Sequence, residues 1–440
     1  MTRPTIVGNT QPLSDSQTFS DSQPSAFDAS PNRSKELGPV EQMSDREDIG
    51  RLRQPIQAGD PILIFDDCAP NGSSAIVTAA RVVTDRTVNV LSRLSGGLLQ
   101  VAISPSRSAA FMLHPLRSQH DHAPTTPLRA PQKEEWLVSV EARHGVGSGI
   151  SISDRRTTIR LLGSEDPQPN TLARPGHLFP CRCHPGGVIA RAAIPEAALD
   201  LVVGCGMTDA AVFSYLLDDN GEISSPSEAQ AFAKKNDIPA IALSTILSWR
   251  LRHECLIEQI ASSELPTLLG GDLRMHVFRS LVDSSEQVAL VKGSIDPNQP
   301  TLVRVHVEEP IDDLIGTTSS ANLASSNLAS GNSHLSSSRS RLEIALKYLD
   351  QAPCGVLVYL RPSLQRYALS TRILETNSPE QPTQPLPTPP NGSSMTEFGI
   401  GAQILRAVGV KAVTILCRTK RPYEILKLFG LHVVGYRELR

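Results

Sequence analysis

Aromatic side chains are scarce in this chain, because Phe, Trp and Tyr together make up 4% of its 440 residues. Proteins that bind single-stranded nucleic acid stack bases on aromatic rings, so this composition argues against such a role. A basic excess is also absent: 42 Lys and Arg residues stand against 45 Asp and Glu residues, which gives a formal net charge of −3. Little positive charge is then available to release counterions from a polyanion. We therefore expect no nucleic-acid partner.

Cysteines and long apolar runs are also few. Seven cysteines in a chain of this length are too few for a disulfide scaffold and indicate a reducing, cytoplasmic compartment. No apolar run reaches the ~20 residues that span a bilayer, and residues 1–25 lack the apolar segment of a secretory signal. We therefore expect no membrane association. A plastid or another organelle is the alternative if the Ser- and Thr-rich N-terminus is a transit peptide.

Three segments have the composition of unstructured chain. They are residues 1–50, the Ser- and Asn-rich residues 317–340 and the proline-rich residues 375–394. Two globular blocks remain, at residues 51–262 and 263–440. Since a domain usually has roughly 100–200 residues, we expect two domains, the second interrupted by low-complexity insertions.

Hydrophobic patterns of both the strand and the helix period occur in each block, which predicts an α+β fold. The predicted strands are residues 61–67, 96–104, 134–142, 210–219, 239–244, 272–281, 286–295, 301–307, 355–361, 412–418 and 431–439. The predicted helices are residues 74–83, 154–162 with Asp154 as a possible N-cap, 227–237, 245–261, 341–350, 401–409 and 423–429.

Several stretches resemble known families. In the first block, SVEARHGVGSGISISDRRTTIRLL and RPGHLFPCRCHPGGVIARA resemble 3,4-dihydroxy-2-butanone-4-phosphate synthase. In the second block, ALVKGSIDPNQPTLVRVHVEE, GVLVYLR and FGIGAQILRAVGV resemble GTP cyclohydrolase II. Their order is similar to that in bifunctional riboflavin-biosynthesis proteins, over about residues 51–440. The resemblance implies a synthase-like α/β domain followed by a cyclohydrolase-like α+β domain.

The resemblance also implies a synthase site, at which key positions are changed. The family converts ribulose 5-phosphate into a four-carbon phosphate and formate, with Mg²⁺ as cofactor. Its two metal-ligand positions are Asn71 and Ile194 here, its substrate-binding Asp position is Ala75, and its catalytic Glu position is Tyr215. Mg²⁺ requires hard oxygen ligands, and a neutral amide loses most of the charge that a carboxylate provides. We therefore predict no metal at this site.

Other positions of the synthase pattern persist. The resemblance implies substrate-binding or pocket-shaping roles for retained residues, and a catalytic role for His177. The retained residues are Asp66, Asp67, Ser148, Gly149, Asp154, Arg155, Thr158 and Arg191. Two interpretations stay open: a preserved phosphate pocket, or residues kept for helix initiation and packing.

The cyclohydrolase pattern implies a zinc ion held by three cysteines. Glu309 stands at the first cysteine position, and residues 310–353 contain no cysteine, so a three-thiolate site cannot form there. The catalytic Asp and Arg positions are Ser394 and Thr396, and two later family positions are Cys417 and Pro422. Arg304, His306 and Glu308 persist as candidate substrate-binding residues, and the segment 399–405 is interpreted as a helix start with packing residues.

We expect no cofactor, although the family would use Mg²⁺ and Zn²⁺. The leading hypothesis is a catalytically degenerate family member that acts as a binding, oligomerising or regulatory partner. It would form a homodimer, or a heteromer with an active riboflavin-pathway enzyme, and would take a sugar phosphate or nucleotide as ligand. The alternative is residual dihydroxybutanone-phosphate synthase activity with the cyclohydrolase activity lost.

Two smaller groups of residues carry further expectations. Cys181 and Cys183, beside His177 and His184, could chelate a metal or be small core residues on one strand face. The basic residues Lys234, Lys235, Arg250 and Arg252 are expected on exposed helix faces.

Overall fold

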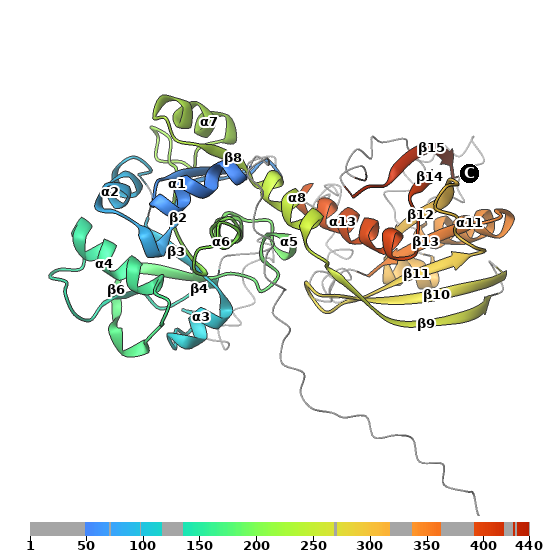
Figure 1. Ribbon diagram of the computed structural model, residues 1–440, viewed down its shortest axis with the longest axis horizontal. Coiled ribbons are helices and arrows are strands. Elements are labelled where there is room, and N and C mark those ends of the chain that lie inside the picture. Colours follow the sequence, from blue (N-terminus) through green and yellow to red (C-terminus); the bar gives the residue numbers. More distant parts are fainter. Residues whose placement is uncertain are drawn as a thin grey trace, which may run out of the picture. The chain divides into compact units, whose positions relative to one another are not determined.

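The computed structural model describes residues 49–69, 72–96, 98–116, 135–267, 271–316, 337–361, 391–417, 426 and 429–439. The chain divides into two units, Met1–Gly38 and Pro39–Arg440, and every described residue lies in the second. Two mixed sheets with accompanying helices form this part of the chain (Figure 1). The predicted combination of helices and strands is confirmed. Among the described residues no helix is long and apolar enough to cross a membrane.

The first sheet has eight strands, in the order β4-β6-β3-β7-β2-β1-β8, with β5 paired to β6 off this path. The strands are β1 (Ile62–Phe65), β2 (Ser74–Ala79), β3 (Gln100–Ile103), β4 (Glu135–Trp136), β5 (Val140–Ala142), β6 (Leu172–Arg182), β7 (Ala210–Tyr215) and β8 (Ala240–Ala242). β2 runs antiparallel to β1 on one side and to β7 on the other, and all of its residues are buried. This central strand belongs to the site discussed below.

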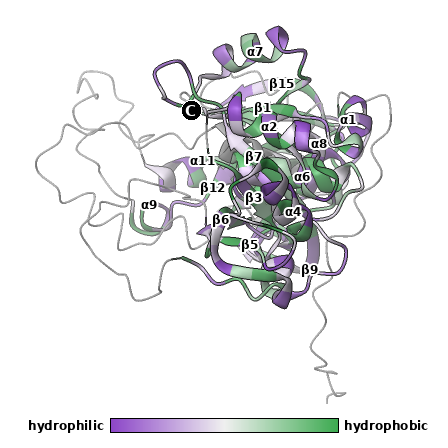
Figure 2. Ribbon diagram, turned by 90° about the vertical axis from the view of Figure 1, so that its left-hand side faces the viewer, coloured by the Kyte–Doolittle hydropathy of each residue, from purple (hydrophilic) through white to green (hydrophobic). Residues whose placement is uncertain are grey.

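The helical elements that accompany this sheet are η1 (Gly50–Leu52), α1 (Arg53–Ala58), η2 (Ala80–Val82), α2 (Asp85–Arg93), α3 (Pro105–Ala110), α4 (Ile152–Leu162), η3 (Pro169–Thr171), α5 (Gly187–Ala190), α6 (Ile194–Gly204), α7 (Pro226–Lys235) and α8 (Leu243–His253). Successive strand residues point to opposite faces, so the sheet contributes to two hydrophobic clusters. One cluster includes the buried face of α6, and the other includes residues of α2 and α4. Figure 2 shows hydrophobic residues gathered in these interior elements.

The second sheet has seven strands, in the order β15-β14-β12-β13-β11-β10-β9. They are β9 (Ile257–Thr267), β10 (Gly271–Ser280), β11 (Glu286–Lys292), β12 (Thr301–Val307), β13 (Gly355–Leu360), β14 (Ala412–Cys417) and β15 (His432–Glu438), with α9 (Pro310–Ile315), α11 (Ser338–Gln351) and α13 (Asn391–Ala407). Val303 and Ile415 share a cluster with α13, whereas Leu302 and Leu416 share one with α11. Because side chains alternate along a strand, α11 and α13 cover opposite faces of this sheet.

One predicted helix was wrong, and another was predicted too long. Residues 74–83 form β2 and η2, because this segment is rich in Ile, Val and Thr and its first part is a fully buried central strand. The helix predicted over 245–261 ends at His253, where Glu254 takes an extended conformation, and Ile257 begins β9. The helix predicted over 423–429 lies outside the described residues except for Leu426 and Phe429. The domain limits 51–262 and 263–440 stay predictions.

Some ends and faces also differ from expectation. Ser151, rather than Asp154, caps α4, since its hydroxyl accepts the Asp154 N–H at 3.1 Å. Three expected unstructured segments reach into ordered chain: Ile49 is buried, Ser337 caps α11, and α13 begins at Asn391. Because α13 starts there, the segment 399–405 lies inside this helix and not at its start.

Two predictions about single side chains are settled by burial. Arg250 is 5% exposed, so its expected place on an exposed helix face was wrong. Cys181 and Cys183 are both buried in one hydrophobic cluster, in line with the core interpretation of these residues.

Candidate functional site

The substrate-binding Asp and catalytic Glu positions of the synthase pattern lie side by side. Ala75 of β2 and Tyr215 of β7 are cross-strand partners in an antiparallel pair. Such partners point to the same face of a sheet. Ala75 is fully buried, and Tyr215 packs against the same cluster, with its ring centroid 5.7 Å from that of Phe213 in an edge-to-face arrangement. The two positions therefore carry a methyl group and a phenol in place of two carboxylates.

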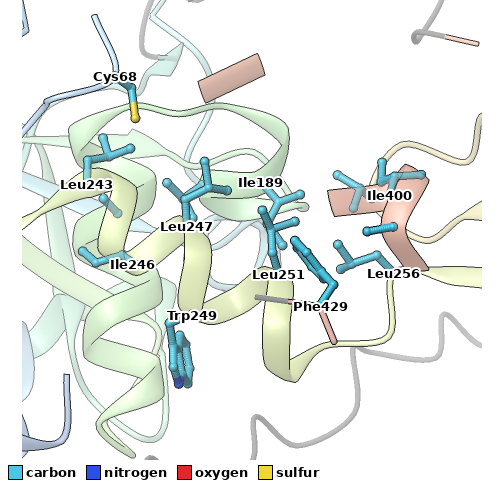
Figure 3. Close-up of a cluster of buried hydrophobic side chains, with 14 of the residues drawn as sticks. Cys68, Ile189, Leu243, Ile246, Leu247, Trp249, Leu251, Leu256, Ile400 and Phe429 are labelled. Atoms are coloured by element: carbon cyan, nitrogen blue, oxygen red, sulfur yellow. The ribbon is translucent and has the colours of Figure 1, made fainter. Parts of the chain in front are cut away.

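The metal-ligand position Ile194 belongs to the same hydrophobic cluster. It begins α6 and is 1% exposed. Cys68, which follows the two retained aspartates, is 2% exposed and also lies in this cluster. Figure 3 shows the part of the cluster along α8, from Cys68 and Leu243 at one end to Leu256 and Ile400 at the other. Asn71, the other metal-ligand position, lies outside the described residues.

The two retained aspartates hold local structure. The Asp66 carboxylate accepts the Cys68 N–H at 2.9 Å, and burial raises its pKa. The Asp67 carboxylate accepts the Ser244 N–H at 3.0 Å and the Ser244 hydroxyl at 2.5 Å. Ser244 lies in the first turn of α8, whose exposed N–H groups need acceptors. Asp67 therefore caps α8.

These residues do not fit the family's Mg²⁺ site. Asp66, Asp67 and Cys68 form the one group of three His, Cys, Asp or Glu residues with metal-ligand spacing in the described part of the chain. Burial and the neighbouring carboxylates raise the pKa of the Cys68 thiol to about 12, so it stays protonated at neutral pH. Mg²⁺ takes oxygen ligands, and the Asp67 oxygens already bind Ser244.

The positive charge of Arg191 is paired with a carboxylate of the same chain. Its guanidinium forms an ion pair with Glu196, which is fully buried, and donates to the Arg182 carbonyl at 3.3 Å. Glu196 also accepts the His184 N–H at 2.9 Å. Arg191 therefore has a structural role in fixing the chain before α6.

His177 forms a partly exposed pair with Glu141. Its Nδ1 lies 2.9 Å from Glu141 Oε2, and the two side chains are 46% and 26% exposed. Gly149 adopts φ +77°, and a Cβ there would lie 2.2 Å from Glu141 Oε2. The Gly149 N–H donates to Asp154 at 3.0 Å, which holds the loop against the pair. Glu141 was not identified from the sequence as a site residue. The alternating pattern of the predicted strand 134–142 indicated only the face on which Glu141 lies.

Two further retained synthase residues, Thr158 and Arg155, differ in role. Thr158 is buried and joins α4 to β5, since its hydroxyl accepts the Ala142 N–H at 2.9 Å and donates to the Asp154 carbonyl at 3.1 Å. Arg155 has a buried Nε with no hydrogen-bond partner among the described residues. Packing explains Thr158, the Nε of Arg155 is buried, and the His177–Glu141 pair is partly exposed, so that a ligand can reach it.

The zinc position of the cyclohydrolase pattern carries an ion pair. Glu309 lies 3.4 Å from the Arg341 guanidinium, and Glu308 lies 3.4 Å from that of Arg361. No cluster of thiols or histidines with metal-ligand spacing occurs in the described residues of this block. The residues present therefore do not fit a Zn²⁺ site. Side chains at Ser394 and Pro422 lie outside the described residues.

His306 is buried in a hydrogen-bonded group. Its Nε2 lies 3.1 Å from Asp313 Oδ1, and its ring stacks on that of Tyr359 with the ring centroids 5.4 Å apart. The Tyr359 hydroxyl donates to Asp313 at 2.8 Å. Burial lowers the pKa of His306, which favours the neutral ring despite the opposing charge of Asp313. Arg304 donates to the Leu416 carbonyl at 3.2 Å. His306 is therefore closed off from solvent.

The FGIGAQIL segment secures the end of α8. Gln403 Nε2 donates to the carbonyls of Leu251 at 3.0 Å and Glu254 at 2.8 Å, and Gln403 Oε1 accepts the Leu256 N–H at 2.8 Å. A Cβ at Gly399 would lie 2.6 Å from Leu251 Cδ2. These residues satisfy the last carbonyls of a helix, which explains their presence without any catalytic role.

Gln403→Leu is expected to lower the free energy of unfolding by about 2–3 kcal/mol, because three part-buried backbone groups lose their partners. Urea denaturation followed by circular dichroism measures the change. The exposed Gln299→Leu serves as the control and should shift stability by less than about 0.5 kcal/mol. An equal, small shift in both variants would contradict the role given to Gln403.

Comparisons with known proteins agree with this architecture. The family model for 3,4-dihydroxy-2-butanone 4-phosphate synthase matches residues 51–249, and that for GTP cyclohydrolase II matches residues 258–438. In fold alone, the chain resembles the crystal structure of RibBX, a two-domain 3,4-dihydroxy-2-butanone 4-phosphate synthase from A. baumannii. The TM-score is 0.67 at 22% identity, with 89% of this chain and 99% of that chain covered.

Curated relatives span most of the chain. Riboflavin biosynthesis protein RibBA of Aquifex aeolicus is 31% identical, covering 89% of this chain and 93% of the relative. Monofunctional riboflavin biosynthesis protein RIBA 2, chloroplastic, of Arabidopsis thaliana is 30% identical, covering 88% of this chain and 76% of the relative. With both domain families matched in this order, the chain belongs to the family of two-domain riboflavin-biosynthesis proteins that join a dihydroxybutanone-phosphate-synthase-like part to a GTP-cyclohydrolase-II-like part.

Proposed function

We propose that this chain is a catalytically degenerate member of its family and acts as a binding or assembly partner in riboflavin biosynthesis. The observation that carries the proposal is the Ala75–Tyr215 pair, which puts apolar and phenolic groups where the synthase pattern has two carboxylates. Ile194 extends the same hydrophobic cluster into a metal-ligand position. A site of this kind offers neither the charge that Mg²⁺ needs nor a base at neutral pH.

The second block supports the same proposal. The Glu309–Arg341 ion pair occupies the zinc position, and His306 is sequestered by Asp313 and Tyr359. A zinc ion would supply the activated water for hydrolysis of GTP. Since the described side chains here are engaged with one another, they support the fold and not that reaction.

A noncatalytic role leaves the question of what the chain binds. The partly exposed His177–Glu141 pair is the polar group that supports a sugar-phosphate ligand. We propose a homodimer, or a heteromer with an active family enzyme, as the assembled form. The chloroplastic names of the Arabidopsis thaliana relatives agree with a plastid location as an alternative to the cytoplasm.

Formate release tests the proposal, because both family reactions produce formate. The purified chain is incubated with ribulose 5-phosphate and Mg²⁺, and separately with GTP and Zn²⁺, beside an authentic active enzyme of the family for each reaction as a positive control. Loss of the metal and of the general base predicts formate at least about a thousandfold below the control in both reactions.

Residual synthase activity is the second candidate, favoured by the partly exposed His177–Glu141 pair. It predicts formate from ribulose 5-phosphate that disappears in His177→Ala and persists in His144→Ala, a nearby exposed histidine. That pattern, in variants with unchanged circular dichroism, would overturn the degenerate assignment.

A further inference from the structure

A cavity of about 160 Å³ lies between the second sheet and α13. Its wall is mostly aliphatic, and the residues that form it include Val303, Val305, Leu405 and Ile415. Val303, Leu405 and Ile415 are buried, so this wall belongs to the interior of the block and not to its outer surface. Small-molecule sites in proteins are usually concave and largely apolar. The cavity is therefore a candidate binding site.

Small residues of α13 leave this space open. A Cβ at Gly401 would lie 3.8 Å from both Val305 Cγ1 and Leu360 Cδ1, so this face of the helix is turned toward β12 and β13. Ala402, the next residue, is fully buried and lines the cavity. With only a hydrogen atom and a methyl group at these positions, the helix does not fill the volume in front of the sheet.

Arg304 adjoins the cavity but does not direct its charge into it. The pairing of β12 with β14 ends at Val303, and Arg304 follows where the two strands part. Because side chains alternate along a strand, Arg304 leaves β12 on the α11 face with Leu302, whereas Val303 leaves it on the α13 face. The Arg304 Nη1 donates to the Leu416 carbonyl at 3.2 Å. The guanidinium is therefore no ligand group of the cavity.

The charge on the α13 side of the wall is negative. Glu397 lines the cavity and stands one helical turn before Gly401 and two turns before Leu405, on the same face of α13. Its carboxylate disfavours phosphates and other anions nearby. A ligand charge of either sign would also lose its hydration against the aliphatic wall. The wall therefore suits an uncharged ligand and not a nucleoside triphosphate.

The volume of the cavity limits the size of the ligand. Water is a poor occupant, because it needs two to four polar partners and an aliphatic wall offers few. An apolar cavity of about 150 Å³ is large enough to bind benzene. The cavity beside α13 has a similar volume, so it suits one six-membered ring with small substituents. Burying such a ring removes its apolar surface from water, which favours binding.

We propose that this cavity binds a small uncharged hydrophobic molecule of the size of one aromatic ring, held between β12 and α13. The inference deepens the proposed loss of GTP chemistry and rests on it, because the cavity lies in the cyclohydrolase-like block. The two can still fail separately: hydrolysis of GTP is detected as formate, whereas the hydrophobic ligand is detected as heat of binding.

The test measures binding of toluene to the full chain by isothermal titration calorimetry, with benzoate and benzylamine as anionic and cationic probes that carry the same ring. We expect toluene to bind with a Kd below about 1 mM, and each charged probe to bind at least about tenfold more weakly. Absence of toluene binding at its solubility limit would overturn the inference. Equal or tighter binding of a charged probe, or displacement of toluene by GTP, would overturn it as well, because the ligand class would then be incorrect.

Variants of α13 locate the ligand. Ala402→Phe fills the cavity and should abolish toluene binding, whereas Ala407→Phe, at an exposed position of the same helix, should leave the affinity within about twofold. Leu405→Ala changes the cavity in the opposite direction: it enlarges the space and should strengthen naphthalene binding at least about tenfold. Circular dichroism reports whether each variant folds. Unchanged toluene affinity in folded Ala402→Phe, or unchanged naphthalene affinity in Leu405→Ala, would overturn the assignment to this cavity.

Discussion

Restoring the family's aspartate at position 75 is expected to destabilise this protein by about 4 kcal/mol instead of rebuilding a binding site. Ala75 is fully buried between β1 and β7, next to Tyr215 and within a hydrophobic cluster. An ionised carboxylate placed there would lose its hydration without gaining a cationic partner. Urea denaturation of Ala75→Asp at neutral pH measures the loss.

The pH dependence of that loss identifies its cause. Burial would raise the pKa of the new carboxyl above its unfolded value of about 3.9. The destabilisation should therefore be largest above the folded pKa and should shrink as the pH falls through the folded pKa toward the unfolded value, because the group is protonated in both states only below about pH 3.9. Ala231→Asp, on the exposed side of α7, should cost less than about 1 kcal/mol at either pH. A stable Ala75→Asp variant would mean that the first site is still polar, and would weaken the proposed degeneracy.

Arg250→Met is expected to lower the free energy of unfolding by about 3–5 kcal/mol. Arg250 Nη1 lies 2.8 Å from Asp200, and its Nη2 lies 2.6 Å from Glu254. The three side chains are 7%, 13% and 10% exposed, so removing the cation leaves two carboxylates with little water. Nη1 also donates to the Gly186 carbonyl at 2.9 Å, which would lose that donor.

The matched control lies two residues along the same helix. Arg252 is exposed, and its Nε donates to the Ser248 carbonyl at 3.2 Å. Arg252→Met should therefore change the stability by less than about 0.5 kcal/mol. Adding Asp200→Leu to Arg250→Met should recover part of the loss, because one of the uncompensated charges is removed. Equal effects of the two arginine variants in thermal or urea unfolding would show that the buried ion pairs contribute nothing specific.

Hydrophobic patterns in the sequence predicted those elements whose structure depends mainly on neighbouring residues. The apolar runs at 61–67 and 210–219 form β1 and β7, and the family motifs identified both domains. The burial of Arg250 could not be predicted, because its partner Asp200 lies 50 residues earlier in the chain. Residues 74–83 are rich in Ile, Val and Thr, which favour strands, so the local composition already argued for the extended form that the neighbouring strands β1 and β7 stabilise.

The candidate site shows the same limit. The replacements at Ala75, Ile194 and Tyr215 are visible in the sequence. Only the structure shows that the three residues share one hydrophobic cluster. Whether Asp67 persists for a ligand or for the fold depends on Ser244, a contact across 177 residues of sequence. Glu141 went unnoticed because its partner His177 lies on another strand.

The two ends of α8 have a consequence for the order in which this protein folds. Its first turn is capped by Asp67, 177 residues earlier, and its last carbonyls are satisfied by Gln403, about 150 residues later. A short helix gains little stability from its own turns and relies on tertiary contacts. During synthesis α8 therefore stays incomplete at its C-terminal end until residue 403 has left the ribosome, so the first sheet and its helices reach their final stability only after most of the second block has been made.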